Sequence, residues 1–360
     1  MRLNIKNNIL KYITRKIGGQ KYLSIQIDIT NACNLRCTHC YHSHHKNKGA
    51  LSLNQWKQVL SQYKDLLNKL HLEPSITICG GEPTISPLFI PILDYIKHNF
   101  DNSRVNVLSN GVTITDAFIN KTKNYNLNYQ ISLDGPDAKR HDLIRGKGNF
   151  DKAINGIKIL KKNNIPVNLL AILSKKTSTW LEDFYKTADQ LNVNFMNFTR
   201  FIPVGYGKSL KQSGNDDVLL GLGLKHALEK IVHYSKSYNV GTNTNEPLYH
   251  LIDESLGQHG KFGFQGLVVD YKGFLKVSSR ADVSLGSVLD EGLENLFFND
   301  PILKDLRKGN IKVCGSCPYY KRCGGNRNMS YAVTGSFLSA DVGCWLNTNQ
   351  KEKYLSLIHI

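Results

Sequence analysis

The chain has 360 residues, of which 41% are hydrophobic and 21% are charged, a composition that excludes a disordered protein. No stretch approaches the roughly eighteen consecutive apolar residues of a membrane span, and the N-terminus lacks the features of a signal peptide, so we expect a cytoplasmic protein without a membrane partner. The net charge of +17 comes from lysines spread along the chain, which favours a solvated basic surface over a nucleic-acid site.

From Tyr22 onward, segments with the pattern of strands alternate with segments that have the spacing of amphipathic helices. Such alternation predicts right-handed β-α-β units, and therefore an α/β fold whose parallel sheet is a barrel-like arc or an open doubly wound sheet. Ser52 is the expected N-cap of the first of these helices. The predicted strands are 22–30, 75–79, 104–109, 127–133, 166–173 and 193–201, and the predicted helices between them are 51–70, 88–100, 116–123, 150–163 and 179–191.

The alternation stops after residue 207. A link containing SGNDD (213–217) is followed by one long predicted helix at 223–238, and then by a predicted hairpin at 267–279 and a helix at 293–307. We therefore predict three parts: a core at 1–210, a helical linker at 211–255 and a small α+β domain at 256–360.

Three cysteines, Cys33, Cys37 and Cys40, follow the first predicted strand with the spacing C-x3-C-x2-C. Disulfides are rare in the cytosol, so clustered cysteines there are more often metal ligands or catalytic groups. Structural zinc, a redox thiol pair and an iron–sulfur cluster are the candidates. Zinc normally takes four ligands, whereas three thiolates would leave one iron of a four-iron cluster open.

Two other polar, glycine-bearing segments follow predicted strands. Gly80-Gly81-Glu82 comes directly after the second strand and Ser109-Asn110-Gly111 directly after the third. In a parallel α/β sheet these loops converge with the cysteine loop at the carboxyl ends of the strands, where the chemistry is expected.

The segment CNLRCTHCY (33–41) resembles the signature of the radical S-adenosylmethionine (SAM) enzymes. This resemblance implies a partial (β/α)6 TIM-like barrel, SAM and a [4Fe-4S] cluster as cofactors, and a flavodoxin or ferredoxin-type electron donor. In that family the free iron chelates the amino and carboxylate groups of SAM. Reductive cleavage of SAM then gives a 5'-deoxyadenosyl radical, which abstracts a hydrogen atom from the substrate.

The same resemblance extends through GGEP (80–83), LSNGV (108–112), ISLDGP (131–136), HDLIRGKGNF (141–150) and FIPVGYG (201–207). It implies that Glu82 accepts from the ammonium of SAM and that Arg145 pairs with its carboxylate, so these two are the candidate catalytic residues. For Asn110, Ser132 and Asp134, ordinary turn and cap chemistry is the alternative. The implied cofactor contacts are Tyr41 near the adenine, Gly80 and Gly81 at the methionyl group, Asn110 facing the cofactor, and Ser132 and Asp134 at the ribose.

A second set of cysteines, Cys314, Cys317, Cys323 and Cys344, has the spacing C-x2-C-x5-C-x20-C. A zinc ribbon is one interpretation of this spacing. The segment also resembles the C-terminal extension called SPASM, in which these positions hold an auxiliary [4Fe-4S] cluster. Serines at 278–279 and Arg327 stand where a further auxiliary cluster would need cysteines, so the resemblance implies two clusters in total and a reduced SPASM or twitch domain.

The remaining cysteine, Cys79, ends the second strand. A hydrogen-atom donor and a small buried packing residue are its two interpretations, and we favour packing. We also favour a solvated loop over a metal site for the histidine run at 42–45.

The expected function is a radical SAM enzyme that matures a ribosomally made peptide by cross-linking, epimerisation or dehydrogenation. The alternatives are modification of a small molecule, such as aminosugar oxidation or porphyrin decarboxylation, and a non-catalytic iron–sulfur binding or electron-transfer protein. An RNA-modifying enzyme is admitted only by the charge.

Overall fold

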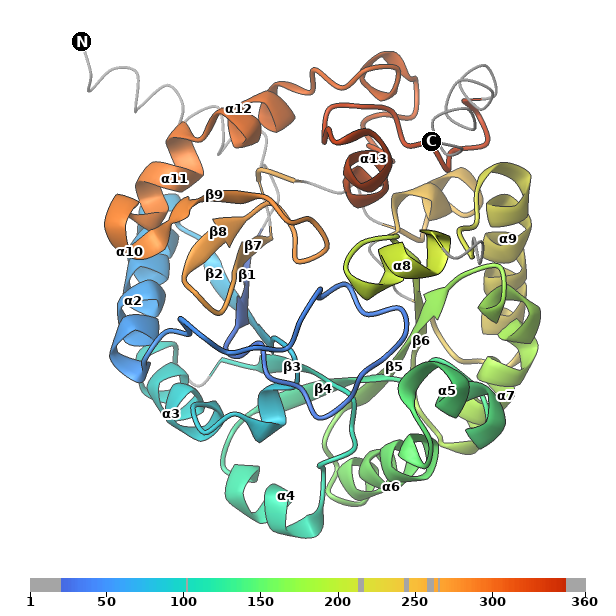
Figure 1. Ribbon diagram of the computed structural model, residues 1–360, viewed down its shortest axis with the longest axis horizontal. Coiled ribbons are helices and arrows are strands. Elements are labelled where there is room, and N and C mark those ends of the chain that lie inside the picture. The colour runs from blue at the N-terminus through green and yellow to red at the C-terminus, as the bar shows by residue number, and fades with distance from the viewer. Residues whose placement is uncertain are drawn as a thin grey trace.

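The computed structural model describes residues 21–101, 103–212, 217–242, 246–257, 262–264 and 266–347 (Figure 1). Across these residues runs an open sheet of nine strands in the order β6-β5-β4-β3-β2-β1-β7-β8-β9. The strands from β6 to β7 are parallel to one another, and β8 and β9 continue the sheet antiparallel. The strands are β1 (Tyr22–Asp28), β2 (Glu73–Cys79), β3 (Val105–Ser109), β4 (Leu127–Ser132), β5 (Val167–Leu173), β6 (Met196–Arg200), β7 (Leu267–Val269), β8 (Phe274–Lys276) and β9 (Ser284–Ser287).

Helices surround the curved sheet on its outer side (Figure 1). Ser52 begins the first of them with a capping box to Gln55, which confirms the predicted N-cap. The helices of the barrel region are α2 (Leu53–Leu70), α3 (Phe89–Asn99), α4 (Asp116–Thr122), α5 (Ala138–Arg145), α6 (Asn149–Lys162), α7 (Leu181–Gln190), α8 (Tyr206–Gln212) and α9 (Gly221–Ser237), with short 3-10 turns η1 (Pro83–Ile85), η2 (Thr177–Trp180) and η3 (Pro247–Leu251). The C-terminal part has α10 (Val288–Glu291), α11 (Leu293–Asn299), α12 (Pro301–Lys308), η4 (Cys314–Ser316) and α13 (Arg327–Thr334).

One hydrophobic core joins the sheet to its helices and reaches into the C-terminal part. Alternate residues of the strands are buried, as in β5, where Val167, Leu169, Ala171 and Leu173 are buried and the residues between them are partly exposed. Residues as distant in sequence as Ile27 and Phe297 belong to the same buried cluster. The C-terminal part is therefore packed against the barrel through apolar side chains.

A buried ion pair also connects these parts. Nη1 of Arg200, the last residue of β6, lies 2.9 Å from Oδ2 of Asp341 and 3.5 Å from Oε1 of Glu246. Burial alone would lower the pKa of Arg200 and raise that of Asp341, but their mutual attraction raises the first and lowers the second. The pair therefore stays charged and links the end of the parallel sheet to the cysteine-rich end of the chain.

The prediction of an α/β fold with six parallel strands between helices is confirmed, and the arc of strands is not closed. The single helix predicted at 293–307 is wrong, because Asp300 caps a new helix that begins at Pro301, where a continuing helix would lose a backbone donor. Helices α5 and α8 and strand β9 were not predicted. All but the last residue of the SGNDD link at 213–217 lies outside the described residues.

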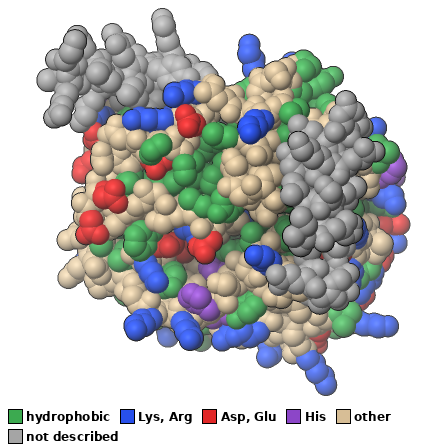
Figure 2. All heavy atoms as spheres, turned by 45° about the horizontal axis from the view of Figure 1, so that its top comes forward, with side chains coloured by type: hydrophobic (Ala, Val, Ile, Leu, Met, Phe, Trp, Pro, Cys, Tyr) green, Lys and Arg blue, Asp and Glu red, His purple; other side chains and the backbone are tan. Residues whose placement is uncertain are grey.

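The predicted boundaries at 210 and 256 remain predictions, although the sheet itself runs on from β1 into β7. Both basic and acidic side chains are distributed over the face shown in Figure 2. In the described part of the chain, no helix has both the length and the apolar character needed to cross a membrane.

Candidate active site

The loop after β1 carries Cys33, Cys37 and Cys40 across the carboxyl ends of the parallel strands (Figure 1). All three cysteines are partly exposed and none forms a disulfide. The N–H of Thr38 donates to the carbonyl of Ile144 in α5 at 3.0 Å, and the N–H of Cys40 donates to the carbonyl of Cys37 at 3.2 Å. The loop is thus held by backbone hydrogen bonds.

The surroundings of these thiols favour the neutral thiol over the thiolate, which is the form that binds a metal. Burial raises the pKa of Cys33 to about 11 and also raises the pKa values of Cys37 and Cys40, while the nearby Arg145 guanidinium opposes the shift at Cys37 and Cys40. Among the described residues, no three His, Cys, Asp or Glu side chains gather as closely as a single metal ion requires. In a four-iron cluster each thiolate binds a separate iron, so the three-cysteine donor set fits that group.

Gly80 and Gly81 bring the loop after β2 against the loop after β1. A Cβ on either residue would lie 2.2 Å from a backbone oxygen, that of Thr30 for Gly80 and that of Ala32 for Gly81. The N–H of Gly81 donates to Thr30 O at 2.8 Å, and the N–H of Glu82 donates to Ala32 O at 2.9 Å. The glycines are therefore required by this backbone contact, and their contact with the methionyl group of SAM remains a prediction.

Glu82 is buried and serves as an anchor for the neighbouring loops. Its Oε1 accepts from the hydroxyls of Thr84 at 2.6 Å and Ser109 at 2.8 Å, and its Oε2 accepts from the N–H of Asn110 at 2.7 Å. Burial raises its pKa, and these hydrogen bonds oppose the shift. Oε2 keeps one lone pair, so the predicted hydrogen bond from an ammonium is compatible with this geometry.

Asn110 lies at the end of β3 and faces the cysteine loop. Its amide Nδ2 donates to Oδ1 of Asn34 at 2.8 Å, while its Oδ1 accepts from the N–H of Val112 at 3.0 Å. The hydrogen bond to Val112 is the turn contact that was considered as the alternative for Asn110. The hydrogen bond to Asn34 adds a contact with the segment between Cys33 and Cys37. Ser132, also predicted to meet the cofactor, is the last residue of β4 and is partly buried.

Asp134 and Arg145 form a buried pair beside the cysteine loop. Nε of Arg145 donates to Oδ2 of Asp134 at 2.5 Å, Nε2 of His39 lies 2.7 Å from the same oxygen, and the N–H of Ile172 donates to Oδ1 at 2.7 Å. Burial alone would raise the pKa of Asp134, but the Arg145 guanidinium and the His39 ring hold it well below its usual range. Asp134 therefore orients Arg145, and a ribose contact for Asp134 remains a prediction.

Tyr41 reaches the end of β2 with its hydroxyl. Its hydroxyl lies 3.8 Å from Sγ of Cys79, and its ring lies 4.3 Å, centre to centre, from that of His42. Gly205, after β6, approaches so closely that a Cβ there would lie 2.2 Å from Tyr41 O. Cys79 is buried, as expected of a packing residue, and the predicted adenine contact of Tyr41 remains open.

The second cysteine set lies in the C-terminal part, and none of its members forms a disulfide. Cys314 and Cys317 are partly exposed, whereas burial raises the pKa of Cys323 to about 12 and that of Cys344 to about 11. The buried Arg327 donates through Nη1 to the carbonyl of Phe337 at 3.0 Å, and its Nη2 lies 3.6 Å from Sγ of Cys314. The guanidinium of Arg327 thus lies beside the thiol of Cys314.

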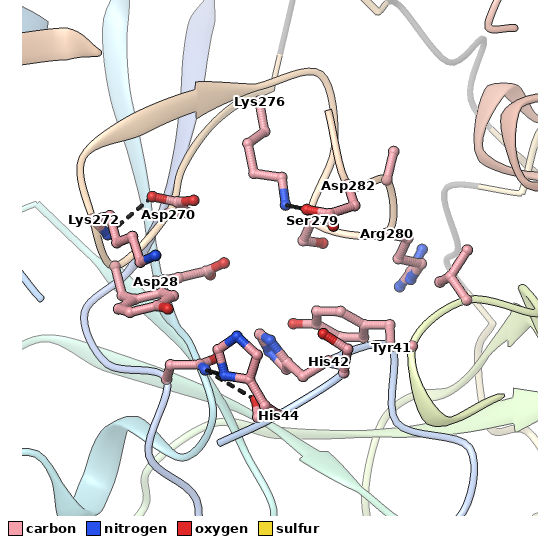
Figure 3. Close-up of a pocket in the computed structure, with 16 residues that line it drawn as sticks. Asp28, Tyr41, His42, His44, Asp270, Lys272, Lys276, Ser279, Arg280 and Asp282 are labelled. Atoms are coloured by element: carbon pink, nitrogen blue, oxygen red, sulfur yellow. Dashed lines mark hydrogen bonds and ion pairs between the residues drawn. The ribbon is translucent and has the colours of Figure 1, made fainter. Parts of the chain in front are cut away.

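A cavity of about 320 Å³ lies between the cysteine loop and the hairpin segment at 270–282 (Figure 3). Tyr41 and His42 line one wall, Asp28 lies at the end of β1, and Lys276 and Arg280 extend from the hairpin segment on the other side. His42 and His44 of the histidine run contribute to this cavity, so that run is not simply a solvated loop.

Several residues of the site were missed by the sequence analysis. Asn34 and His39 lie between the cysteines of the signature, but nothing in their spacing reveals the partners Asn110 and Asp134. Arg280 is brought to the cavity by a strand pairing between distant segments, for which the sequence carries no local signal.

Residues 27–190 match the family model described as "Radical SAM superfamily". These residues belong to the radical SAM superfamily. The predicted radical SAM enzyme is thereby confirmed, together with SAM and one [4Fe-4S] cluster as the cofactors that the family implies. That Cys33, Cys37 and Cys40 ligate this cluster remains a prediction, with which the donor set described above is compatible.

Curated relatives are similar to this chain over most of its length. Mycofactocin maturase MftC of Mycobacterium tuberculosis (strain CDC 1551 / Oshkosh) is 28% identical over 329 residues, which cover 86% of this chain and 78% of the relative. The AdoMet-dependent heme synthase of Methanosarcina barkeri (strain Fusaro / DSM 804) is 24% identical over 357 residues, which cover 90% of this chain and 96% of the relative.

Solved structures share the fold. A structure of anSMEcpe with bound AdoMet and Cp18Cys peptide has a TM-score of 0.71 at 18% identity and covers 94% of this chain and 99% of that one. Streptococcus suis SuiB bound to precursor peptide SuiA has a TM-score of 0.69 at 16% identity and covers 92% of this chain and 78% of that one.

Proposed function

We propose that this radical SAM enzyme matures a ribosomally made peptide by abstracting a hydrogen atom from one of its residues. The observation that carries the chemistry is the loop of Cys33, Cys37 and Cys40 beside the fixed guanidinium of Arg145. The peptide class is supported by the relative named as a mycofactocin maturase and by the fold shared with SuiB, which was solved with its precursor peptide.

Cys33, Cys37 and Cys40 would hold the four-iron cluster at three of its irons and leave the fourth for SAM. Bound in this way, SAM supplies a radical that can remove hydrogen from an unactivated C–H bond, a step that side chains alone do not perform. Arg145 retains its two terminal amino groups for a carboxylate, since within the described residues only its Nε takes part in a hydrogen bond.

We further propose that Cys314, Cys317, Cys323 and Cys344 hold a second [4Fe-4S] cluster. Four cysteine ligands leave no open iron, so this group would relay or accept an electron rather than bind substrate. A flavodoxin or ferredoxin-type protein would donate the first electron, and a cytoplasmic location would keep both clusters reduced. The two clusters belong to the core at 1–210 and the C-terminal domain at 256–360, with 211–255 as the link.

Modification of a small molecule is the second candidate. The relative named as an AdoMet-dependent heme synthase matches 90% of this chain, so a porphyrin substrate has support of the same kind as a peptide. The two candidates share the same radical chemistry and differ in the substrate offered to the cavity.

The test is anaerobic incubation of the iron-reconstituted protein with dithionite and SAM. We expect 5'-deoxyadenosine above the level of a Cys33→Ala variant, with Cys79→Ala as the matched cysteine control that retains activity. A peptide encoded beside the gene should change mass in this assay, whereas a mass change only in an iron porphyrin would favour the second candidate. No 5'-deoxyadenosine above the Cys33→Ala level would contradict the enzymatic function and favour an electron carrier.

A further inference from the structure

The cavity between the cysteine loop and the hairpin segment adjoins the proposed reaction site. Tyr41, which follows Cys40 directly, forms part of its wall, and Gly205 approaches Tyr41 from the segment after β6. A group bound in the cavity would therefore lie next to the loop that carries the cluster ligands. A concave site with a few converging polar groups is the usual form of a substrate pocket.

Arg280 is the unusual member of this wall. Its guanidinium points into the cavity (Figure 3), and this group takes part in no hydrogen bond or ion pair with a residue in the described part of the chain, although the backbone N–H of Arg280 donates to Ser278. Burial lowers the pKa of Arg280, while the nearby Tyr41, Cys79 and Glu246 act in the opposite direction. A partly buried cation with five donors and no partner is costly unless a ligand satisfies it.

Lys276 supports a positive charge on the same side. It has a single ion pair in the described structure, at 3.7 Å to Asp282, and the side chain of Lys276 is only 15% exposed, whereas that of Asp282 extends fully into solvent. Such a long, solvent-exposed pairing neutralises a charge poorly. Lys276 and Arg280 of the hairpin segment therefore face the cavity on this side, and Lys272 lines its other end.

Three carboxylates line the cavity, and only Asp282, the partner of Lys276, lies on the side of Arg280. In Figure 3, Asp28 and Asp270 stand together at the end away from Arg280. The Oδ1 of Asp270 already accepts from the N–H groups of Lys272 and Phe274, and the Oδ1 of Asp28 accepts from Gln26. Lys272 also lines that end and balances its charge, whereas the guanidinium of Arg280 has no anionic partner among the described residues. A negatively charged ligand is therefore favoured at the Arg280 end.

We propose that this cavity binds a carboxylate group of the substrate, with Arg280 as its direct partner and Lys276 beside it. The inference rests on the proposed function, because it assigns the cavity to the substrate of that same site. The forked donors of an arginine match the two oxygens of a carboxylate, which a lysine or a neutral amide would not match. A free C-terminus of a peptide and an acidic side chain offer this same chemistry.

The test measures binding of small probes to the full-length, anaerobically reconstituted protein in the presence of SAM, by isothermal titration calorimetry. N-acetyl-phenylalanine offers a main-chain carboxylate, and N-acetyl-glutamic α-amide offers a side-chain carboxylate. N-acetyl-phenylalaninamide and N-acetyl-glutaminamide are the matched neutral probes. We expect at least one carboxylate to bind roughly 10-fold or more tightly than its neutral counterpart.

Substitutions of Arg280 test whether this residue causes the preference for carboxylate over neutral probes. Arg280→Met should weaken the preferred carboxylate by roughly 10- to 100-fold, and Arg280→Lys by less, because it keeps the charge but not the fork. Arg104→Met is the matched control, since Arg104 is exposed at the start of β3 and remote from the cavity. The comparison of charged and neutral probes on the unaltered protein decides the question even where Arg280→Met fails to fold.

Binding of the phenylalanine carboxylate alone would identify a C-terminus as the ligand, and binding of the glutamic α-amide alone would identify an acidic side chain. Equal affinity for charged and neutral probes, no binding of either carboxylate up to about 10 mM, or unchanged affinity in a folded Arg280→Met protein would overturn the inference. Formation of 5'-deoxyadenosine is measured on the same samples. A protein that forms it without a carboxylate preference keeps the proposed function and loses this inference.

Discussion

Asp134 fixes the position of Arg145 through a hydrogen bond of 2.5 Å between Oδ2 and Nε, and both side chains are largely buried beside the cysteine loop. The other carboxylate oxygen of Asp134 accepts from the N–H of Ile172. This second hydrogen bond fixes the position of the carboxylate itself. The arginine is thereby offered to a ligand with its terminal amino groups in a fixed orientation.

Replacement of Asp134 should therefore weaken SAM binding without removing iron. We expect Asp134→Asn to lower the affinity for SAM by roughly 10- to 100-fold, because the amide keeps the shape but loses the charge that orients Arg145. Equilibrium dialysis with labelled SAM and an iron assay measure the two effects. Asp189→Asn, at an exposed position of α7, is the control, and equal SAM affinity for Asp134→Asn and the unaltered protein would contradict the positioning role.

The iron content separates the two cysteine sets. Cys37→Ala and Cys323→Ala should each remove about half of the iron bound after reconstitution, and the double variant nearly all of it, if each set holds one four-iron cluster. Iron and sulfide assays with electron paramagnetic resonance provide the measurement. Cys79→Ala should bind as much iron as the unaltered protein, because Cys79 belongs to neither set. Zinc in place of iron at the C-terminal set would show that this set is a zinc ribbon.

The buried pair of Arg200 and Asp341 should contribute strongly to stability. Removing one member leaves an uncompensated buried charge, so we expect Arg200→Met to lower the free energy of unfolding by about 3–5 kcal/mol. Chemical denaturation monitored by circular dichroism measures this change. Lys225→Met breaks an exposed pair with Glu229 on α9 and should change stability by less than about 1 kcal/mol. Similar effects of the two substitutions would show that the buried pair does not bind the two parts together.

Asp28 makes the stability depend on pH. Burial raises its folded-state pKa to about 6, and the nearby Asp270 adds to the shift, while Gln26, Lys276 and Cys79 oppose it. A carboxyl whose folded pKa lies above its unfolded value costs stability once both states are ionised, so the protein should lose stability as pH rises from about 4 to about 6.

Asp28→Asn removes this titration. Relative to the unaltered protein, the variant should gain stability with rising pH, on the order of 2–3 kcal/mol between pH 4 and pH 7. Urea denaturation at several pH values measures the difference. Parallel stability curves for the two proteins over this range would contradict the raised pKa.

Gly81 is required by its contact with the backbone of Ala32. A Cβ there would lie 2.2 Å from the carbonyl oxygen, so Gly81→Ala should destabilise the loop and lower both the melting temperature and the iron content. Gly223→Ala in α9 is the matched control, because its Cβ would meet only Leu219 at 3.5 Å and alanine favours a helix by about 1 kcal/mol. A Gly81→Ala protein with normal iron and stability would contradict this close approach.

The sequence was most informative where a signal is local. The period of the strands and helices predicted the parallel sheet, and the spacing of Cys33, Cys37 and Cys40 led to the superfamily that the family model confirms. The N-cap of α2, Ser52, was also predicted from its local sequence. The same local reasoning failed at Pro301, because the apolar spacing of two short helices, α11 and α12, resembles that of one continuous helix.

What the sequence could not predict are partners that meet only after folding. Glu82 is one example, since its carboxylate is taken up by Thr84, Ser109 and Asn110 from neighbouring loops. Arg280 is another, because nothing near it in the chain shows that it will stand opposite Tyr41. Such contacts depend on the register between distant strands, for which a single sequence carries no periodic signal.

The parallel pairing of β7 with β1 has a consequence for synthesis on the ribosome. β1 emerges first, yet its second neighbour, Leu267–Val269, follows only after the whole arc of parallel strands has been made. Until then one edge of β1 exposes unpaired backbone groups, and late, long-range closure of this kind is slow and invites association between nascent chains. A fragment that stops at residue 210 would keep that edge permanently, so we expect it to aggregate even though it contains every cysteine of the first set.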